Sequence, residues 1–179
     1  MIQTLRKPHV VLLLALVCWA AGQTSAWARS EYEVKAAYLY NFTKFITWPQ
    51  TSAQADEPID LCIYGEDPFR TLLEPISRLK ALGRPLRLQY PKETTAISGC
   101  EVLFISASEA RFADELLAKA HAEQILTVSD IRDFAREGGM IGFVTVGNVI
   151  RFQINLQAAR SAGLQISAKL LELAQDVLQ

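Results

Sequence analysis

The sequence has few of the side chains on which common catalytic and metal sites depend. Its 179 residues include only 2 histidines and 3 cysteines. His9 belongs to the first segment and His121 lies near the end of a predicted helix, so the histidines predict neither a catalytic triad nor a metal site. The motifs of serine hydrolases, phosphate-binding loops and dinucleotide-binding folds are also missing. We therefore predict a protein that is not an enzyme and that needs no cofactor or metal.

The chain also lacks an excess of basic residues. It has 18 lysines and arginines against 19 aspartates and glutamates, which gives a formal net charge of −1. Proteins that bind nucleic acids neutralise phosphates with a concentrated basic face, and no basic run is present here. We therefore predict no nucleic-acid partner.

The N-terminal segment has an apolar run that is too short to span a membrane. The run from Val10 to Ala21 covers about a dozen residues, whereas a spanning helix needs about 20. Two basic residues precede the run, and Ala26-Trp27-Ala28 has the small-x-small pattern that signal peptidase recognises. We predict that residues 1–28 are an export signal cleaved near Ala28 and that residues 29–179 form one domain without a membrane span. A retained membrane anchor is the alternative.

Cleavage of this signal leaves two cysteines, Cys62 and Cys100, which are separated by 38 positions. An even number of cysteines in an exported domain indicates a disulfide. In the chain-entropy model, a loop of this length contributes about 4 kcal/mol to stability. Two reduced, buried thiols are the alternative, because the sequence does not give the Cα separation that a bridge requires.

The first predicted helix of the domain begins at Ser30. Ser30-Glu31-Tyr32-Glu33 matches a capping box, and Trp48-Pro49 ends the helical pattern because proline disfavours helix before it. A polar loop is predicted from Thr51 to Pro58. The apolar stripe of the helix consists of Val34, Ala37, Tyr38, Phe42, Phe45 and Ile46.

Beyond this helix, predicted strands and helices alternate. The predicted strands are 59–64, 86–90, 102–105, 125–128, 140–146 and 149–154, and the last two are joined by Gly147-Asn148 in an antiparallel hairpin. The predicted helices are 69–79 after Asp67-Pro68, one after Ser106 or Ser108, a short one after Ser129-Asp130, 156–162 and 167–178. This order predicts an α/β three-layer sandwich with a mostly parallel central sheet, a C-terminal antiparallel hairpin and helices on both faces.

Two sets of residues are candidates for binding. The helix 30–48 has more aromatic residues than one buried stripe needs, and the strand 149–154 has a polar outer side. The partner-binding candidates are Tyr40, Lys44, Trp48, Arg151 and Gln153. Packing in the core and simple solvation are the alternatives for these residues.

The second set lies where parallel strands end, at the edge where α/β folds commonly bind ligands. Glu66 and Asp67 follow the first strand, and Asp130 follows a later one. The ligand-binding candidates are Asp67, Ser106 and Ser108. Capping of the next helix is the alternative role, and the sequence favours it.

Several separated motifs, in one order along the chain, resemble the YfiR-like family. They are residues 36–45 (AAYLYNFTKF) with Trp48-Pro49, Cys62 with Gly65 and Asp67-Pro68-Phe69, residues 126–130 (LTVSD), residues 138–141 (GGMI), residues 151–155 (RFQIN) and residues 167–171 (SAKLL). The resemblance covers nearly all of the predicted mature domain.

The resemblance implies a periplasmic α/β domain that represses a diguanylate cyclase of the inner membrane by binding its periplasmic part. It also implies a disulfide between Cys62 and Cys100, whereas the second cysteine pair of some members has no counterpart here. The expected partner is the periplasmic part of such a cyclase or of another membrane sensor, and pairing of two copies is kept as an alternative. A periplasmic small-molecule-binding module that acts on a membrane sensor is the alternative function.

Overall fold

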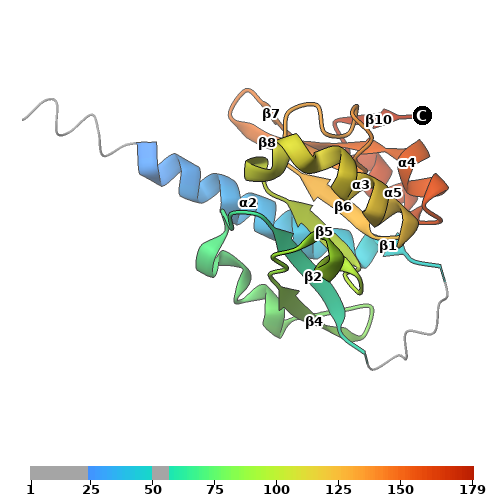
Figure 1. Ribbon diagram of the computed structural model, residues 1–179. Helices are drawn as coiled ribbons and strands as arrows, with labels where there is room; N and C mark the ends of the chain where they lie inside the picture. The colour runs from blue at the N-terminus through green and yellow to red at the C-terminus, as the bar shows by residue number, and fades with distance from the viewer. Residues whose placement is uncertain (1–23, 50–56) are drawn as a thin grey trace, which may run out of the picture.

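Figure 1 shows a computed structural model of the chain, which describes residues 24–49 and 57–179, with side chains from residue 31 onward. The predicted export signal up to residue 23 and the predicted polar loop up to residue 56 lie outside the described residues. Within the described ranges, no helix is both long enough and apolar enough to cross a membrane.

The centre of the fold is a sheet of eight strands in the order β10-β8-β7-β6-β5-β2-β4-β3. Neighbouring strands run parallel from β4 to β7 and again between β8 and β10, whereas β7–β8 and β3–β4 are antiparallel. The strands are β2 (Ile59–Tyr64), β3 (Lys80–Ala81), β4 (Arg84–Gln89), β5 (Val102–Ile105), β6 (Leu126–Ser129), β7 (Ile141–Val146), β8 (Val149–Asn155) and β10 (Asp176–Leu178). A second, two-stranded sheet pairs β1 (Ile46–Thr47) with β9 (Gln165–Ile166).

Helices cover both faces of the main sheet (Figure 1). The α-helices are α2 (Thr24–Phe45), α3 (Ala113–Ala122), α4 (Leu156–Ser161) and α5 (Ala168–Leu173). The 3-10 helices are η1 (Arg70–Leu73), η2 (Ile76–Arg78), η3 (Thr94–Ile97) and η4 (Ala107–Phe112).

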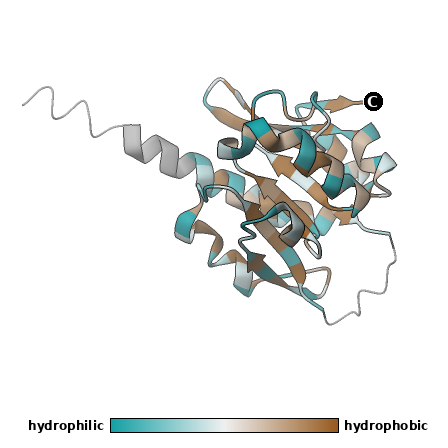
Figure 2. Ribbon diagram, viewed as in Figure 1, coloured by the Kyte–Doolittle hydropathy of each residue, from teal (hydrophilic) through white to brown (hydrophobic). Residues whose placement is uncertain are grey.

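Strand β5 shows how the sheet divides the interior into two cores. Val102 and Phe104 belong to the larger core, beneath α2, α4 and α5. Leu103 and Ile105 belong to the smaller core, which α3 and η3 cover. Successive side chains of a strand point to opposite faces, so a strand buried on both faces must be continuously apolar. Figure 2 shows this as brown colour along the central strands.

Much of the predicted architecture is confirmed. The predicted strands 59–64 and 102–105 have the same bounds as β2 and β5, and β4 lies next to the edge strand β3 as expected. The antiparallel hairpin β7–β8 turns at Gly147, whose φ of +60° suits the first position of a type II′ turn. The fold class, a mostly parallel sheet with a C-terminal hairpin and helices on both faces, is therefore correct.

The start of the first helix differs from the prediction. Helix α2 begins at Thr24, so Ser30 lies inside it and does not cap it. A capping residue has a non-helical backbone, whereas Ala26 and Ala28 are strong helix formers and extend the helix toward the N-terminus.

The buried stripe of α2 also differs. Val34 and Ala37 are exposed, whereas Lys35 and Leu39 are buried. The face toward the sheet repeats at residues 35, 39, 42 and 46, and Ile46 has already left the helix to join β1. A lysine is tolerated on this face because two carboxylates bond to it, as described below.

The predicted helix 69–79 is wrong. Its residues form the short 3-10 helices η1 and η2, although Phe69, Leu73 and Ile76 are buried as expected. Pro75 supplies no backbone N–H and interrupts an α-helix at this point. Arg70 adds a second interruption, because its φ of 52° is left-handed.

Two further predicted helices differ from the structure, although Ser167 caps the second as expected. The segment after Ser129-Asp130 forms turns, and Asp133 has a left-handed φ of 57°, which breaks a helix. The predicted helix 167–178 ends at Leu173, and residues 176–178 form strand β10 instead. The open edge of β8 favours this strand, since the backbone of Gln175 donates to the Phe152 carbonyl oxygen at 2.8 Å and so begins the pairing.

Candidate functional site

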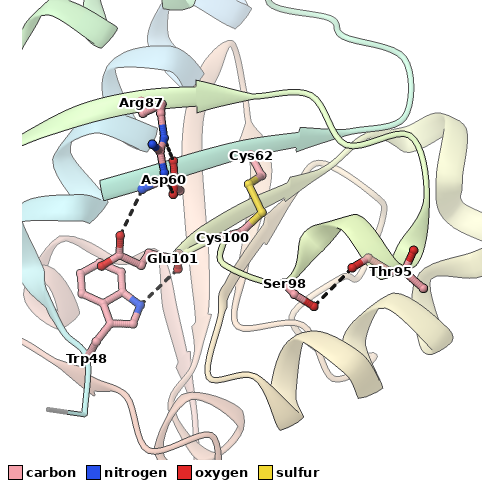
Figure 3. The surroundings of a disulfide bond; sticks show 8 residues. All are labelled: Trp48, Asp60, Cys62, Arg87, Thr95, Ser98, Cys100 and Glu101. Carbon is pink, nitrogen blue, oxygen red and sulfur yellow. Dashed lines mark hydrogen bonds and ion pairs between the residues drawn. A yellow bond between two sulfur atoms is a disulfide. The ribbon is translucent and has the colours of Figure 1, made fainter. Parts of the chain in front are cut away.

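The predicted disulfide between Cys62 and Cys100 is present in the structure, with a Cα–Cα distance of 5.9 Å. Cys62 lies within β2, and Cys100 lies just before β5. Strands β2 and β5 are parallel neighbours, with Cys62 opposite Leu103. Cys100 follows the turn at residues 98–99 that leads into β5, and this turn brings it beside Cys62. Figure 3 shows the bridge close to a group of charged side chains.

These charged side chains form two ion pairs at the amino ends of the parallel strands. Arg87 donates to both oxygens of Asp60, at 2.6 Å each. Arg84 donates to both oxygens of Glu101, at 2.6 and 3.0 Å. Glu101 also accepts from the backbone N–H of Asp60 at 3.1 Å, which connects the two pairs. The hydrogen bonds and charge of Asp60 raise the pKa of Arg87.

A hollow of about 900 Å³ lies beside these ion pairs. Trp48 borders it and donates from Nε1 to the Glu101 carbonyl oxygen at 3.1 Å (Figure 3). A second hollow of about 380 Å³ adjoins the first, and Arg87 and Cys100 border both. Carboxylates outnumber arginines in the described lining, and both arginines are already bonded, so this edge is unsuited to binding phosphate.

The opposite end of the sheet contains a buried ionic cluster. The Lys35 ammonium lies 2.7 Å from Asp130 and 2.5 Å from Glu31, and Lys35 is only 3% exposed. The Tyr32 hydroxyl donates to the same Asp130 oxygen at 2.8 Å. Burial, reinforced by the hydrogen bond to Asp130, raises the pKa of Tyr32. The other oxygen, Oδ1 of Asp130, is buried and has no hydrogen-bond partner among the described residues.

The three ligand-binding candidates bond to nearby backbone in the structure. Asp67 accepts from the Phe69 N–H at 2.8 Å, and Ser106 accepts from the Ser108 N–H at 3.4 Å. Ser108 in turn accepts from the Glu66 N–H at 3.0 Å. These bonds stabilise the turns after β2 and β5, and neither of the two hollows described above is bordered by these residues.

The five partner-binding candidates do not form one surface. Tyr40 donates to the Lys80 carbonyl oxygen at 3.0 Å, and the Lys44 ammonium lies 3.7 Å from the centre of the Tyr40 ring, so both belong to α2 where it approaches β3. Trp48 borders the larger hollow, at the amino ends of the parallel strands. Arg151 and Gln153 point to the face of β8 opposite the larger core, because Phe152 between them belongs to that core.

His121, the histidine outside the predicted export signal, is exposed in the last turn of α3. Across residues 31–49 and 57–179, no cluster of three or more His, Cys, Asp and Glu side chains is arranged to hold a metal ion.

Sequence reasoning overlooked Lys35, Arg84, Arg87 and Glu101. One signal was available for Arg87, since Asp60 stands alone among the apolar residues of β2 and a buried carboxylate needs a partner. A second was available for Lys35, because it shares the helical spacing of Leu39 and Phe42. Which basic residue meets which carboxylate depends on the strand register, which the sequence does not give.

Comparison with known proteins identifies one family. The family model described as YfiR/HmsC-like matches residues 32–175.

Two solved structures are similar to parts of this chain. One is an ABC domain in complex with L-Trp from Streptococcus pneumonia, with a TM-score of 0.51 and 12% identity over 68% of this chain and 55% of that chain. The other is a conserved domain protein from Vibrio cholerae, with a TM-score of 0.48 and 12% identity over 66% of this chain and 54% of that chain. This chain therefore spans about half the length of each, and the first similarity concerns the fold alone.

Proposed function

This chain belongs to the YfiR/HmsC-like family, and from that premise we propose that it is a periplasmic regulatory protein that represses a membrane-bound diguanylate cyclase, or another membrane receptor, by binding its periplasmic part. In this proposal residues 1–28 direct export and are removed near Ala28, and residues 29–179 act as one domain. The observation that carries the proposal is the family match over residues 32–175, which is nearly all of that domain.

The disulfide supports export to an oxidising compartment. Disulfides persist in the periplasm and are rare in the cytoplasm, where thiols are kept reduced. Cys62 and Cys100 are both buried and are joined across neighbouring strands, as suits a structural bridge.

The arrangement of the charged groups supports action by contact. The carboxylates and cations described at the two ends of the sheet bond to one another and fix the positions of α2, β2, β4 and β5. Because these charged side chains are bonded to one another, they hold the neighbouring elements in place and so stabilise the shape of the protein surface. Repression then follows if this surface binds the inactive state of the cyclase more tightly than the active state, because a ligand shifts an equilibrium by its difference in affinity for the two states.

The proposal is tested by deleting the gene in the bacterium that encodes it and measuring cyclic di-GMP. Deletion should raise the cyclic di-GMP level, and the full-length gene should restore the low level. A matched control gene that encodes residues 29–179 without the leader should fail to restore it, because its product stays in the cytoplasm. An unchanged cyclic di-GMP level, together with no membrane protein crosslinked to the chain, would refute the proposal.

A further inference from the structure

The β7–β8 hairpin extends beyond the strand that lies beside it. Strand β6 pairs with β7 only at Val128–Ile141 and Ser129–Gly142. The pairing of β7 with β8 continues along the hairpin as far as Val146 and Val149. Residues 143–146 therefore have β8 on one side and no paired strand on the other within the described structure (Figure 1).

The hydrogen-bond pattern shows which backbone groups point to that open side. The Met140 carbonyl oxygen accepts from the Asn155 N–H at 2.8 Å, so Met140 points toward β8. In an antiparallel pair the direction alternates along the strand. Phe143 and Thr145 therefore direct their backbone N–H and C=O groups away from β8. The pairing of Ser129 with Gly142 uses the Phe143 N–H, so the groups without a backbone bond in the described residues are the Phe143 carbonyl oxygen and the N–H and carbonyl oxygen of Thr145.

The composition of this edge contrasts with that of the other edges. Folded proteins protect open edges with lysine, proline, charge or a covering segment. Strand β3 and its neighbour β4 contain Lys80 and Pro85, and β10 covers part of β8. The open part of β7, Phe143-Val144-Thr145-Val146, contains only strand-favouring residues and no charge.

The side chains of the hairpin tip add apolar surface to this edge. Val146 and Val149 lie opposite each other and are 48% and 51% exposed. Val144 shares their face of the hairpin, because it lies two positions before Val146 in the strand. An added strand would therefore find backbone partners and an apolar strip side by side.

We propose that the open edge of β7, residues 143–146, binds an extended segment of the membrane partner as an additional β-strand. This inference rests on the function proposed above and specifies how that partner is held. The segment would alternate apolar and polar residues, and its apolar side chains would lie against Val144 and Val146.

The short length of the edge favours a tethered partner over a second copy. Four residues of strand span about 13 Å. Two such edges paired with each other bury far less than the roughly 1,200 Å² that a stable interface needs. A segment of a partner that already contacts this protein elsewhere binds as an intramolecular event, for which a small edge is sufficient.

The first test is Thr145→Pro in the full-length gene. Proline removes an N–H that points to the open side, so it blocks strand addition while it leaves the bonds to β8 in place. The matched control is Thr145→Val, which keeps the N–H. In the deletion strain the valine variant should restore low cyclic di-GMP, and the proline variant should leave it at least fivefold higher at equal periplasmic abundance.

A second measurement uses the unaltered protein, in case the proline variant fails to fold. Membrane vesicles from the deletion strain are added to the purified protein, and backbone amide exchange is followed. Exchange at Thr145 should slow at least tenfold. Amide exchange at Ile150 is the internal control and should not change, because the Ile150 N–H points away from β7. The Phe152 carbonyl oxygen points to the same side, where it accepts from the Gln175 N–H.

The outcomes separate this inference from the function on which it rests. If deletion leaves cyclic di-GMP unchanged, the proposed function is wrong. If deletion raises it and Thr145→Pro restores the low level, or if vesicles leave the exchange at Thr145 unchanged, the strand-addition site alone is wrong. Slower exchange that depends on protein concentration without vesicles would show a second copy at this edge and would also overturn the inference.

Discussion

Lys35 is a cation in an almost fully enclosed position. Its ammonium lies between Asp130 and Glu31 and 4.3 Å from the centre of the Tyr32 ring. Because Asp130 follows β6 and Lys35 belongs to α2, the ion pair joins the long helix to the carboxyl end of the sheet. The stability of each buried charge depends on its partner, because a charge that loses its partner remains buried away from water.

Replacing Lys35 with methionine should therefore destabilise the protein markedly. The Lys35→Met variant leaves Asp130 without its ionic partner, and removing one member of a buried pair costs about 3–5 kcal/mol. The measurement is urea unfolding of the oxidised protein.

The control for this prediction is Lys119→Met, which removes the more accessible ion pair of Lys119 with Glu123 in α3. Pairs of that kind contribute less than about 1 kcal/mol. Equal losses of unfolding free energy in the two variants would contradict the special role of Lys35.

Gly139 is required by packing between two elements. A Cβ atom at this position would lie 2.2 Å from the ring of Phe134, which the turn after β6 places in the smaller core. Gly139→Ala should therefore lower the unfolding free energy by about 1–3 kcal/mol, as overpacking of a core does. Thermal unfolding of the variant measures the loss.

Two variants test this explanation for Gly139. Adding Phe134→Leu should recover part of the loss, because the smaller side chain leaves room for the new methyl group. Gly147→Asn is the control at a position where a Cβ meets no atom within 4 Å, and asparagine tolerates the φ of +60° found there. A loss at Gly147 as large as that at Gly139 would show that the crowding near Phe134 is not the cause.

Elements with a strong local pattern were predictable. Strand β2 is a short apolar run that ends at Gly65, and the β7–β8 hairpin has a glycine-first link. Elements that depend on distant contacts were not predictable. Residues 176–178 continue a helical pattern in the sequence, but β8 offers them an open edge. The prediction of helix 69–79 followed the spacing of its apolar residues and disregarded Pro75. Proline is incompatible with the interior of an α-helix, so two short 3-10 helices form instead.

The disulfide affects the stability of the whole molecule. It joins the middle of β2 to the chain just before β5 across 38 positions. The variant with both Cys62→Ala and Cys100→Ala should lose about 4 kcal/mol of unfolding free energy, because the unfolded chain regains the entropy of an open loop. Chemical denaturation of both proteins under oxidising conditions gives this difference.

A reducing agent provides the control for the disulfide. It should destabilise the unaltered protein by a similar amount and should leave the double variant unchanged. An unaltered protein that resists the reductant while the variant loses stability would attribute the loss to altered packing of Cys62 and Cys100 rather than to the bridge.

At the scale of the molecule, the sequence was sufficient for the fold class and insufficient for the candidate sites. The alternation of strands and helices needs no knowledge of strand order. The ion pairs of Arg84 and Arg87 depend on the register of β4 beside β2, and the open edge at residues 143–146 depends on where β6 stops. Both features are properties of neighbours in space, which a pattern along the chain does not specify.

The position of β10 has a practical consequence for protein engineering. Residues 176–178 are hydrogen-bonded beside β8 and precede Gln179 directly. A purification tag or fluorescent protein fused immediately after Gln179 would therefore crowd a strand of the main sheet. A flexible glycine-serine spacer would keep the added domain away from β10.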